Sequence, residues 1–296
     1  MADSKLVKKP FRIGKLPKVC LRRILEFMDK HEYLFLANCS AKTAEWVRAE
    51  TVKAPVMKIT LRLSSGISRL EFSSSTHSER YRFSEPNWRP SKNQQPVYNG
   101  TNRLAQHCNE EWRKRASENT GAMCTYMTSL VLNTYQSQLA NLDVDLKGID
   151  VSETLPKIKV STCEHLRLWG VSSSTQHKLQ LLLDTIKVTG TLTFLSNPGT
   201  DFNYQKPFRV PHLNVQFAKW FTRANLLMSN CETISLTHSK LECRDLNTFV
   251  RQWKQGQYKK LKKLEIRQEN VMHVECVVKG LEAKMIERDR VKEYDE

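Results

Sequence analysis

Cysteine and histidine are the side chains in this sequence most able to hold a metal ion or to carry nucleophilic chemistry. The eight cysteines and eight histidines are scattered, and no Cys-x-x-Cys pair occurs. The nearest approaches to ligand spacing are His107-Cys108 and Cys163-Glu164-His165, and neither has a second pair at the distance that a zinc finger needs. We therefore expect no metal site, and we expect the cysteines to be free thiols that pack as small apolar residues.

Motifs of the common enzyme classes are also missing from the sequence. It contains no GxGxxG or GxxxxGK[ST] phosphate loop, no HExxH and no GxSxG. Spacing alone does not exclude a Cys–His pair that meets only in the folded chain, although nothing in the sequence favours one. We expect a protein with no catalytic residue and no cofactor.

Basic residues exceed acidic residues by 47 to 31, so the formal net charge is +16. The densest basic run extends from Arg251 to Lys263 and contains no acid. Such a run is a solvated surface or a binding site for an acidic or phosphorylated protein segment. No zinc finger, RNP-type aromatic motif or basic zipper accompanies it, so nucleic acid is not the expected partner. The candidate substrate contacts are the lysines of the run: Lys259, Lys260, Lys262 and Lys263.

Apolar residues make up 40% of the chain, which is enough to bury a core. No stretch approaches the ~18 consecutive apolar residues of a membrane helix. The first residues, MADSKLVKKPFRIGK, lack the apolar core of a signal peptide. We expect the protein in the cytoplasm, the nucleus or both, without a membrane partner.

The segment 16–50 predicts three short helices. Pro17 suits the first helical position, Asp29 with Glu32 suits the start of a second helix, and Ser40 suits the start of a third. Apolar residues cover most of the circumference of the first two helices. A unit of about 35 residues cannot bury this much apolar surface by itself. Either the rest of the chain or a partner protein must cover it.

The order of residues in this segment carries a resemblance. The residues concerned are Leu16-Pro17, Val19, Ile24-Leu25, Met28-Asp29, Tyr33-Leu34, Leu36 and Cys39-Ser40. Together they resemble the F-box pattern. The resemblance implies a three-helix unit that docks on a Skp-type adaptor, which a cullin scaffold carries in an SCF ubiquitin ligase. The adaptor-binding residues that it implies are Leu16, Pro17, Val19, Ile24, Leu25, Met28, Tyr33, Leu36 and Cys39.

Beyond residue 50, the alternation of polar and apolar residues predicts a hairpin at residues 58–72. A polar loop with a short strand at residues 81–83 follows, and helices are predicted at residues 104–117 and 122–139. Pairs of apolar residues separated by one residue then recur at Leu142/Val144, Leu166/Leu168, Leu192/Phe194, Ile234/Leu236 and Leu264/Ile266. The steps between their first members are 24, 26, 42 and 30, mostly within or near the 20–29 residues of leucine-rich repeats.

Helical stretches are predicted between these pairs, most clearly one with Leu246, Phe249 and Trp253 on one side and Gly256 as its stop. Alternating strands and helices imply a mostly parallel sheet. The expected fold class is α+β overall: an N-terminal three-helix F-box followed by an irregular leucine-rich-repeat-like α/β domain. An ordinary α/β domain with coincidental spacing is the alternative. The expected organisation is an F-box at 11–50, a hairpin and polar linker at 51–103, the α/β domain at 104–275 and a charged tail at 276–296.

A second set of residues lies near the C-terminal end of the sequence. It comprises Trp220, Leu226-Leu227, Cys231-Glu232, Ile234-Ser235-Leu236, Ser239-Lys240-Leu241, Asp245-Leu246-Asn247, Phe249, Trp253, Gly256, Leu261 and Leu264-Glu265-Ile266. These residues resemble the nematode F-box-associated domain of type 2, which typically follows an F-box. The two resemblances imply an SCF substrate-recognition adaptor whose C-terminal domain recruits a protein target. The alternatives are a basic nucleic-acid-binding protein and a scaffold that joins no ligase.

Overall fold

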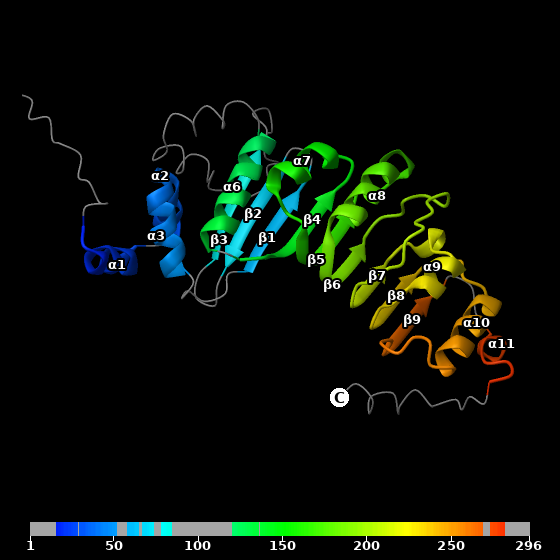
Figure 1. Ribbon diagram of the computed structural model, residues 1–296. Helices are drawn as coiled ribbons and strands as arrows, with labels where there is room; N and C mark the ends of the chain where they lie inside the picture. Colours follow the sequence, from blue (N-terminus) through cyan, green and yellow to red (C-terminus); the bar gives the residue numbers. More distant parts are fainter. Residues whose placement is uncertain are drawn as a thin grey trace, which may run out of the picture. The chain divides into compact units, whose positions relative to one another are not determined.

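A computed structural model describes residues 16–28, 30–51, 58–64, 67–73, 78–84, 120–135, 137–268 and 273–281. This part of the chain combines helices with a mostly parallel sheet, which confirms the α+β class. The strand order is β3-β2-β1-β4-β5-β6-β7-β8-β9 (Figure 1). The chain forms two compact units, and the division between them falls within β4 (Leu139–Asp145) and β5 (Thr162–Trp169). The helix predicted at residues 104–117 lies outside the described residues.

Three helices open the first unit, at the places that the sequence predicts. They are α1 (Lys18–Phe27), α2 (Lys30–Cys39) and α3 (Ala41–Thr51). One apolar core joins them through Leu25 of α1, Leu36 and Ala37 of α2 and Val47 of α3. The Tyr33 hydroxyl donates a hydrogen bond to the Leu25 carbonyl at 2.6 Å, which ties α2 to α1.

The helix starts follow the predicted residues in part. Pro17, predicted at the first helical position, instead precedes α1, and its carbonyl accepts a hydrogen bond from the Leu21 N–H at 3.1 Å. Ser40 caps α3: its hydroxyl accepts from the Thr43 N–H at 3.1 Å, and Thr43 Oγ1 accepts from the Ser40 N–H at 2.9 Å. This reciprocal pair satisfies donors that the start of a helix leaves open. Asp29, the predicted cap of α2, lies outside the described residues.

The hairpin and the short strand of the prediction form an antiparallel meander. Its strands are β1 (Lys58–Leu63), β2 (Ile67–Ser73) and β3 (Ser78–Ser84), the last longer than predicted. Helix α6 (Thr120–Tyr135) packs on β2 and β3. The predicted helix continued to residue 139, but Leu139 begins β4 instead. The Ser137 hydroxyl donates to the Tyr135 carbonyl at 3.1 Å, at the point where α6 ends.

The second unit is built on parallel strands in register: β6 (Lys187–Phe194), β7 (His212–Val215), β8 (Thr233–Thr237) and β9 (Lys263–Arg267). Leu192, Leu213, Ile234 and Leu264 form one cross-strand row, and Phe194, Val215, Leu236 and Ile266 form a second. The repeated apolar pairs of the sequence therefore lie side by side. The prediction missed β7, which divides the step of 42 from Leu192 to Ile234 into two steps of 21 at Leu213.

The segment between β6 and β7 contributes to the core. Its Phe202, Tyr204 and Phe208 side chains are buried. The ring of Trp220 lies 5.3 Å from that of Phe194 and 5.1 Å from that of Phe202, measured between centroids. An aromatic cluster therefore fills the space beside β6 and β7.

Helices connect the strands of this unit. They are α8 (Gln176–Thr185), α9 (Arg223–Met228) and α10 (Cys243–Lys254), while α7 (Val151–Ile158) belongs to the first unit. The prediction for α10 is confirmed: Leu246 and Phe249 are buried, and Gly256 ends it with a φ of 83°. Trp253, predicted on the same buried side, is 38% exposed. No helix among the described residues is long and apolar enough to cross a membrane.

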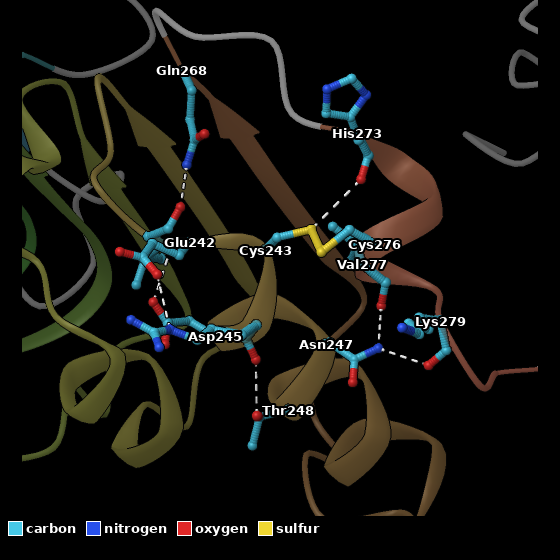
Figure 2. Close-up of a disulfide and its surroundings, with 12 residues drawn as sticks. Glu242, Cys243, Asp245, Asn247, Thr248, Gln268, His273, Cys276, Val277 and Lys279 are labelled. Atoms are coloured by element: carbon cyan, nitrogen blue, oxygen red, sulfur yellow. Dashed lines mark hydrogen bonds and ion pairs between the residues drawn. A yellow bond between two sulfur atoms is a disulfide. The ribbon is translucent and has the colours of Figure 1, made fainter.

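The expectation that the cysteines are free thiols is wrong for two of them. Cys243 and Cys276 form a disulfide, with their Cα atoms 5.8 Å apart (Figure 2). The bond joins α10 to α11 (Val274–Val277), and the Asn247 amide adds hydrogen bonds to the carbonyls of Val277 at 2.7 Å and Lys279 at 3.0 Å. The two cysteines are 33 residues apart in sequence, so only the folded chain brings them together.

Candidate interaction surfaces

The nine residues predicted to face an adaptor fall into three groups. Pro17, Val19 and Cys39 are exposed. Leu16, Ile24, Met28 and Tyr33 are half-buried. Leu25 and Leu36 lie in the core that joins the three helices. The structure therefore gives these residues different surroundings, from solvent to core, within one small helical unit.

Helix α1 carries large apolar side chains on two sides. Leu21 and Leu25 are buried, whereas Val19 is 80% exposed and Phe27 is 82% exposed. At 3.6 residues per turn, Val19 and Phe27 lie on the side of the helix opposite Leu21 and Leu25. We call Val19 and Phe27 the α1 apolar side. Phe27 is missing from the nine predicted residues, although the apolar majority of this helix includes it.

A cation accompanies the α1 apolar side. The Arg23 guanidinium lies 5.7 Å from the centre of the Phe27 ring and binds the Glu26 carboxylate at 2.6 Å. Cation–π contacts of this kind are worth about 0.5–1 kcal/mol at exposed sites. The contact orients Phe27 without covering it, so a large aromatic surface stays open to solvent.

The predicted substrate lysines lie in residues 258–263, which follow α10 and end at the first residue of β9; we call these residues the lysine turn. Contacts of Tyr258 and Leu261 hold its backbone in place. The Tyr258 ring stacks on Phe249 at 4.4 Å, and its hydroxyl donates to Gln252 Oε1 at 2.6 Å. The Leu261 side chain is buried, and its N–H donates to the Tyr258 carbonyl at 3.0 Å. The four lysines that flank Leu261 are exposed.

An acid from the neighbouring strand anchors the lysine turn. Glu232 directly precedes β8, and its carbonyl accepts hydrogen bonds from the N–H groups of Lys262 at 2.7 Å and Lys263 at 3.2 Å. The Lys262 ammonium also binds the Glu232 carboxylate at 2.8 Å. The parallel pairing of β8 with β9 places these residues side by side, since Thr233 pairs with Lys263.

Further cations gather round the same carboxylate. The hydrogen bond from Lys262 lowers the pKa of Glu232, and the charges of Lys262, His212 and Lys260 act in the same direction. His212 is the first residue of β7, and its Nδ1 lies 2.9 Å from Thr233 Oγ1. The prediction missed both Glu232 and His212. Only their positions could have identified them: His212 begins β7 and Glu232 directly precedes β8, next to the lysine turn.

Of the two segments with metal-like spacing, the structure describes Cys163-Glu164-His165. Cys163 is buried, and burial raises its pKa to about 12. His165 Nε2 lies 3.4 Å from the Glu164 carboxylate on the same strand. Across the described ranges, no group of three or more His, Cys, Asp or Glu side chains is placed to hold a metal ion. His107 and Cys108 lie outside those ranges.

Part of the chain is similar to known proteins. Residues 203–266 match the family model described as F-box associated. Over 108 residues the chain is 21% identical to an uncharacterized protein of Caenorhabditis elegans, covering 36% of this chain and 25% of that protein. Over 79 residues it is 30% identical to the E3 ubiquitin-protein ligase hecw-1 of the same organism, covering 27% of this chain and 6% of hecw-1.

The chain thus spans a quarter or less of the length of these two relatives. No solved structure matches the chain. The family match includes β7, β8, α10, β9 and the lysine turn. It confirms the resemblance of residues 220–266 and extends it toward the N-terminus as far as residue 203.

Proposed function

Because residues 203–266 match the F-box associated family model, we propose that the protein is a substrate-recognition adaptor of an SCF-type ubiquitin ligase. In this role α1, α2 and α3 are the F-box that docks on a Skp-type adaptor, which the cullin scaffold carries. The C-terminal unit, as an irregular leucine-rich-repeat-like domain, recruits the protein target. The family match is the observation that carries the proposal. The shared segment with hecw-1, itself an E3 ubiquitin-protein ligase, is consistent with a role in ubiquitin ligation.

The α1 apolar side supports the docking part of the proposal. Val19 and Phe27 are both at least 80% exposed while the opposite side of α1 packs inward. Burying such side chains contributes about 1.5–3 kcal/mol each, so an adaptor that covers both gains several kcal/mol. Leu16, Pro17, Ile24, Met28 and Cys39 would contribute to the rim of the same contact.

Leu25, Leu36 and Tyr33 have a different part in the proposed docking. Leu25 and Leu36 are buried in the three-helix core, and the Tyr33 hydroxyl bonds the Leu25 carbonyl. In the proposal they hold α1 against α2 and α3, so that the adaptor meets a preformed surface. In the proposal they support the docking surface from the three-helix core and do not contact the adaptor themselves.

The chain would act in the ligase without a catalytic step of its own. Its buried thiols are poor candidates for a nucleophile, because burial raises the pKa of Cys124 and Cys163 to about 12 and that of Cys231 to about 11. A thiol with such a pKa is protonated at neutral pH, whereas nucleophilic cysteines react as thiolates.

A pull-down with a purified Skp-type adaptor tests the docking. The double variant V19D/F27D places two carboxylates on the α1 apolar side and should reduce adaptor retention at least about tenfold, since charges replace the buried apolar contact. V274D is the matched control: it introduces the same Val→Asp change at a position that is 54% exposed in α11. We expect V274D to retain the adaptor as wild type does.

Leu25→Asp is unsuitable as a docking variant, because it buries a charge in the three-helix core and should unfold that unit. The proposal is contradicted if V19D/F27D, with wild-type circular dichroism, retains the adaptor as strongly as the unaltered chain. Retention of the adaptor without any cullin from a cell lysate would instead indicate a scaffold outside the ligase.

A further inference from the structure

The lysine turn is a preorganised group of cations rather than a loose charged loop. Tyr258 and Leu261 fix its backbone from the inside, and Glu232 accepts the N–H groups of Lys262 and Lys263. The lysine side chains therefore leave a backbone that is already ordered. A binding surface ordered in advance loses less conformational entropy when a partner binds.

Most lysines of this surface are available to bind an anion. Lys262 is paired with Glu232, whereas Lys259, Lys260 and Lys263 form no ion pair with any residue that the structure describes. The four lysines and the one carboxylate leave a net charge of about +3 on a few residues of surface. An anion that reaches this surface meets several ammonium groups at once.

The grouping of basic residues around Glu232 indicates which kind of anionic ligand this surface fits, a single anionic group or a long polyanion. Lys262 binds the Glu232 carboxylate at 2.8 Å. The next residue, Thr233, pairs with His212 on one side and Lys263 on the other, so the basic residues gather around one point. A nucleic acid backbone needs cations spread along it, because each neutralises a different phosphate. The arrangement fits a compact anion carried on a protein segment better than it fits a strand of phosphates.

Glu232 also sets the kind of anion that can bind. A carboxylate on a target carries the same single charge as Glu232 and has to compete with it for Lys262. A phosphate monoester carries about −1.5 to −2 charges at pH 7 and three acceptor oxygens. It can displace the Glu232 carboxylate from Lys262 and contact Lys260 at the same time, which a carboxylate does less well.

From this arrangement we propose that the lysine turn, with Glu232 and His212, is a binding site for a phosphorylated side chain on a protein target. This inference rests on the proposed role of the C-terminal unit in holding a target, and it names the chemical class of that target. Glu232 acts as an internal competitor that keeps unphosphorylated acidic segments from binding well.

Two peptide libraries on beads test the inference, using the full chain without adaptor or cullin. Both have randomised flanks, and they carry a central phosphoserine or a central serine. Wild type should be retained about tenfold more strongly by the phosphoserine library, because several charge-assisted hydrogen bonds form only there. K260E/K262E should reduce this retention to the level of the serine library.

Matched variants separate the site from net charge and from folding. K147E/K240E makes the same change of charge at two lysines that are exposed elsewhere on the second unit, and it should retain the preference for phosphoserine. K259Q/K260Q/K263Q leaves the Lys262–Glu232 pair intact and should still lose most of the preference. This second variant keeps the test decisive if K260E/K262E does not fold.

Glu232 gives the sharpest outcome. E232Q removes the competitor and should increase retention by a third library, with a central glutamate, about threefold or more. Its matched control is E265Q, which alters a carboxylate bonded to Arg267 at 2.8 Å on β9, and it should change nothing.

Equal retention of wild type by the phosphoserine and serine libraries overturns the inference. So does wild-type retention of K260E/K262E. Stronger retention on a random-sequence DNA duplex, lost in K260E/K262E, would assign the lysine turn to nucleic acid and overturn it as well. None of these assays contains the adaptor, so their failure leaves adaptor docking untouched, and failure of docking leaves them interpretable.

Discussion

At the scale of single residues, one buried carboxylate links strands that are far apart in sequence. The Asp143 side chain of β4 is fully buried, and the Arg62 guanidinium of β1 donates to its Oδ2 through Nε at 3.2 Å and Nη2 at 3.1 Å. Beside them, the Asn141 amide donates to Thr60 Oγ1 at 2.8 Å. These contacts cross 81 residues of chain, and nothing in the local pattern of either strand predicts them.

The two members of this pair should respond unequally to substitution. R62M removes the Nε and Nη2 hydrogen bonds that Arg62 donates to a buried carboxylate and should cost about 3 kcal/mol, because breaking a buried ion pair is strongly destabilising. D143N leaves a guanidinium whose side chain is 40% exposed, so it should cost about 1 kcal/mol. Hydrogen exchange of the β1 amides measures both. Equal costs, or a larger cost for D143N, would contradict this account.

At the scale of elements, the sequence predicts repeated structure better than it predicts isolated structure. The apolar pairs identify β4, β5, β6, β8 and β9, since each pair lies on a strand of one sheet, buried in the first four and half-buried in β9. Strand β7 carries the same pattern in Leu213 and Val215 but is only four residues long. A strand that short looks like part of a loop, which is why the sequence does not predict it.

The features that the sequence does not predict arise from contacts between separate helices and strands. The disulfide, the anchoring of the lysine turn by Glu232 and the exposure of Phe27 depend on which elements become neighbours. The sequence identifies the lysines as a basic run. Only the register of β8 with β9 shows that the Glu232 carboxylate lies beside them. The sequence therefore predicts the lysines of the candidate site but not Glu232 or His212.

The contact of α11 with α10 depends on the disulfide. Helix α11 has no buried residue, so the Cys243–Cys276 bond and the hydrogen bonds of Asn247 and Arg251 hold it in place. C243S/C276S should speed amide exchange in residues 273–281 at least about tenfold, because a crosslink across 33 residues is worth about 3–4 kcal/mol in the chain-entropy model.

Wild type treated with a reductant should match C243S/C276S in this exchange experiment. Amides of β6, which lies outside the crosslinked segment, provide the internal control and should not change. Unaltered exchange in residues 273–281 after reduction would show that the remaining contacts suffice to hold α11.

At the scale of the whole molecule, the chain divides into two compact units, with one candidate surface on each. The α1 apolar side belongs to the first unit and the lysine turn to the second. In the proposed role, the adaptor and the target would therefore bind different units of the chain. In the same role, the net charge of +16 favours acidic targets.

This division predicts that the two activities can be lost one at a time. V19D/F27D should lose the adaptor and keep the preference for the phosphoserine library, and K260E/K262E should do the reverse. Substitutions on separate units without shared contacts usually act independently. Pull-downs of both variants with both baits measure this. Loss of both activities in either variant would indicate that one surface serves both partners.

Strand β9 is the last in the strand order, and its Leu264 and Ile266 are only half-buried while their partners Ile234 and Leu236 are buried. A terminal strand that packs on one neighbour is the place where a sheet begins to fray. The lysine turn leads directly into this strand. A ligand that binds the turn only when β9 is paired therefore shifts the fraying equilibrium by mass action. Occupancy of the site should be readable as slower opening of β9, which would make the end of the sheet a built-in reporter of target capture.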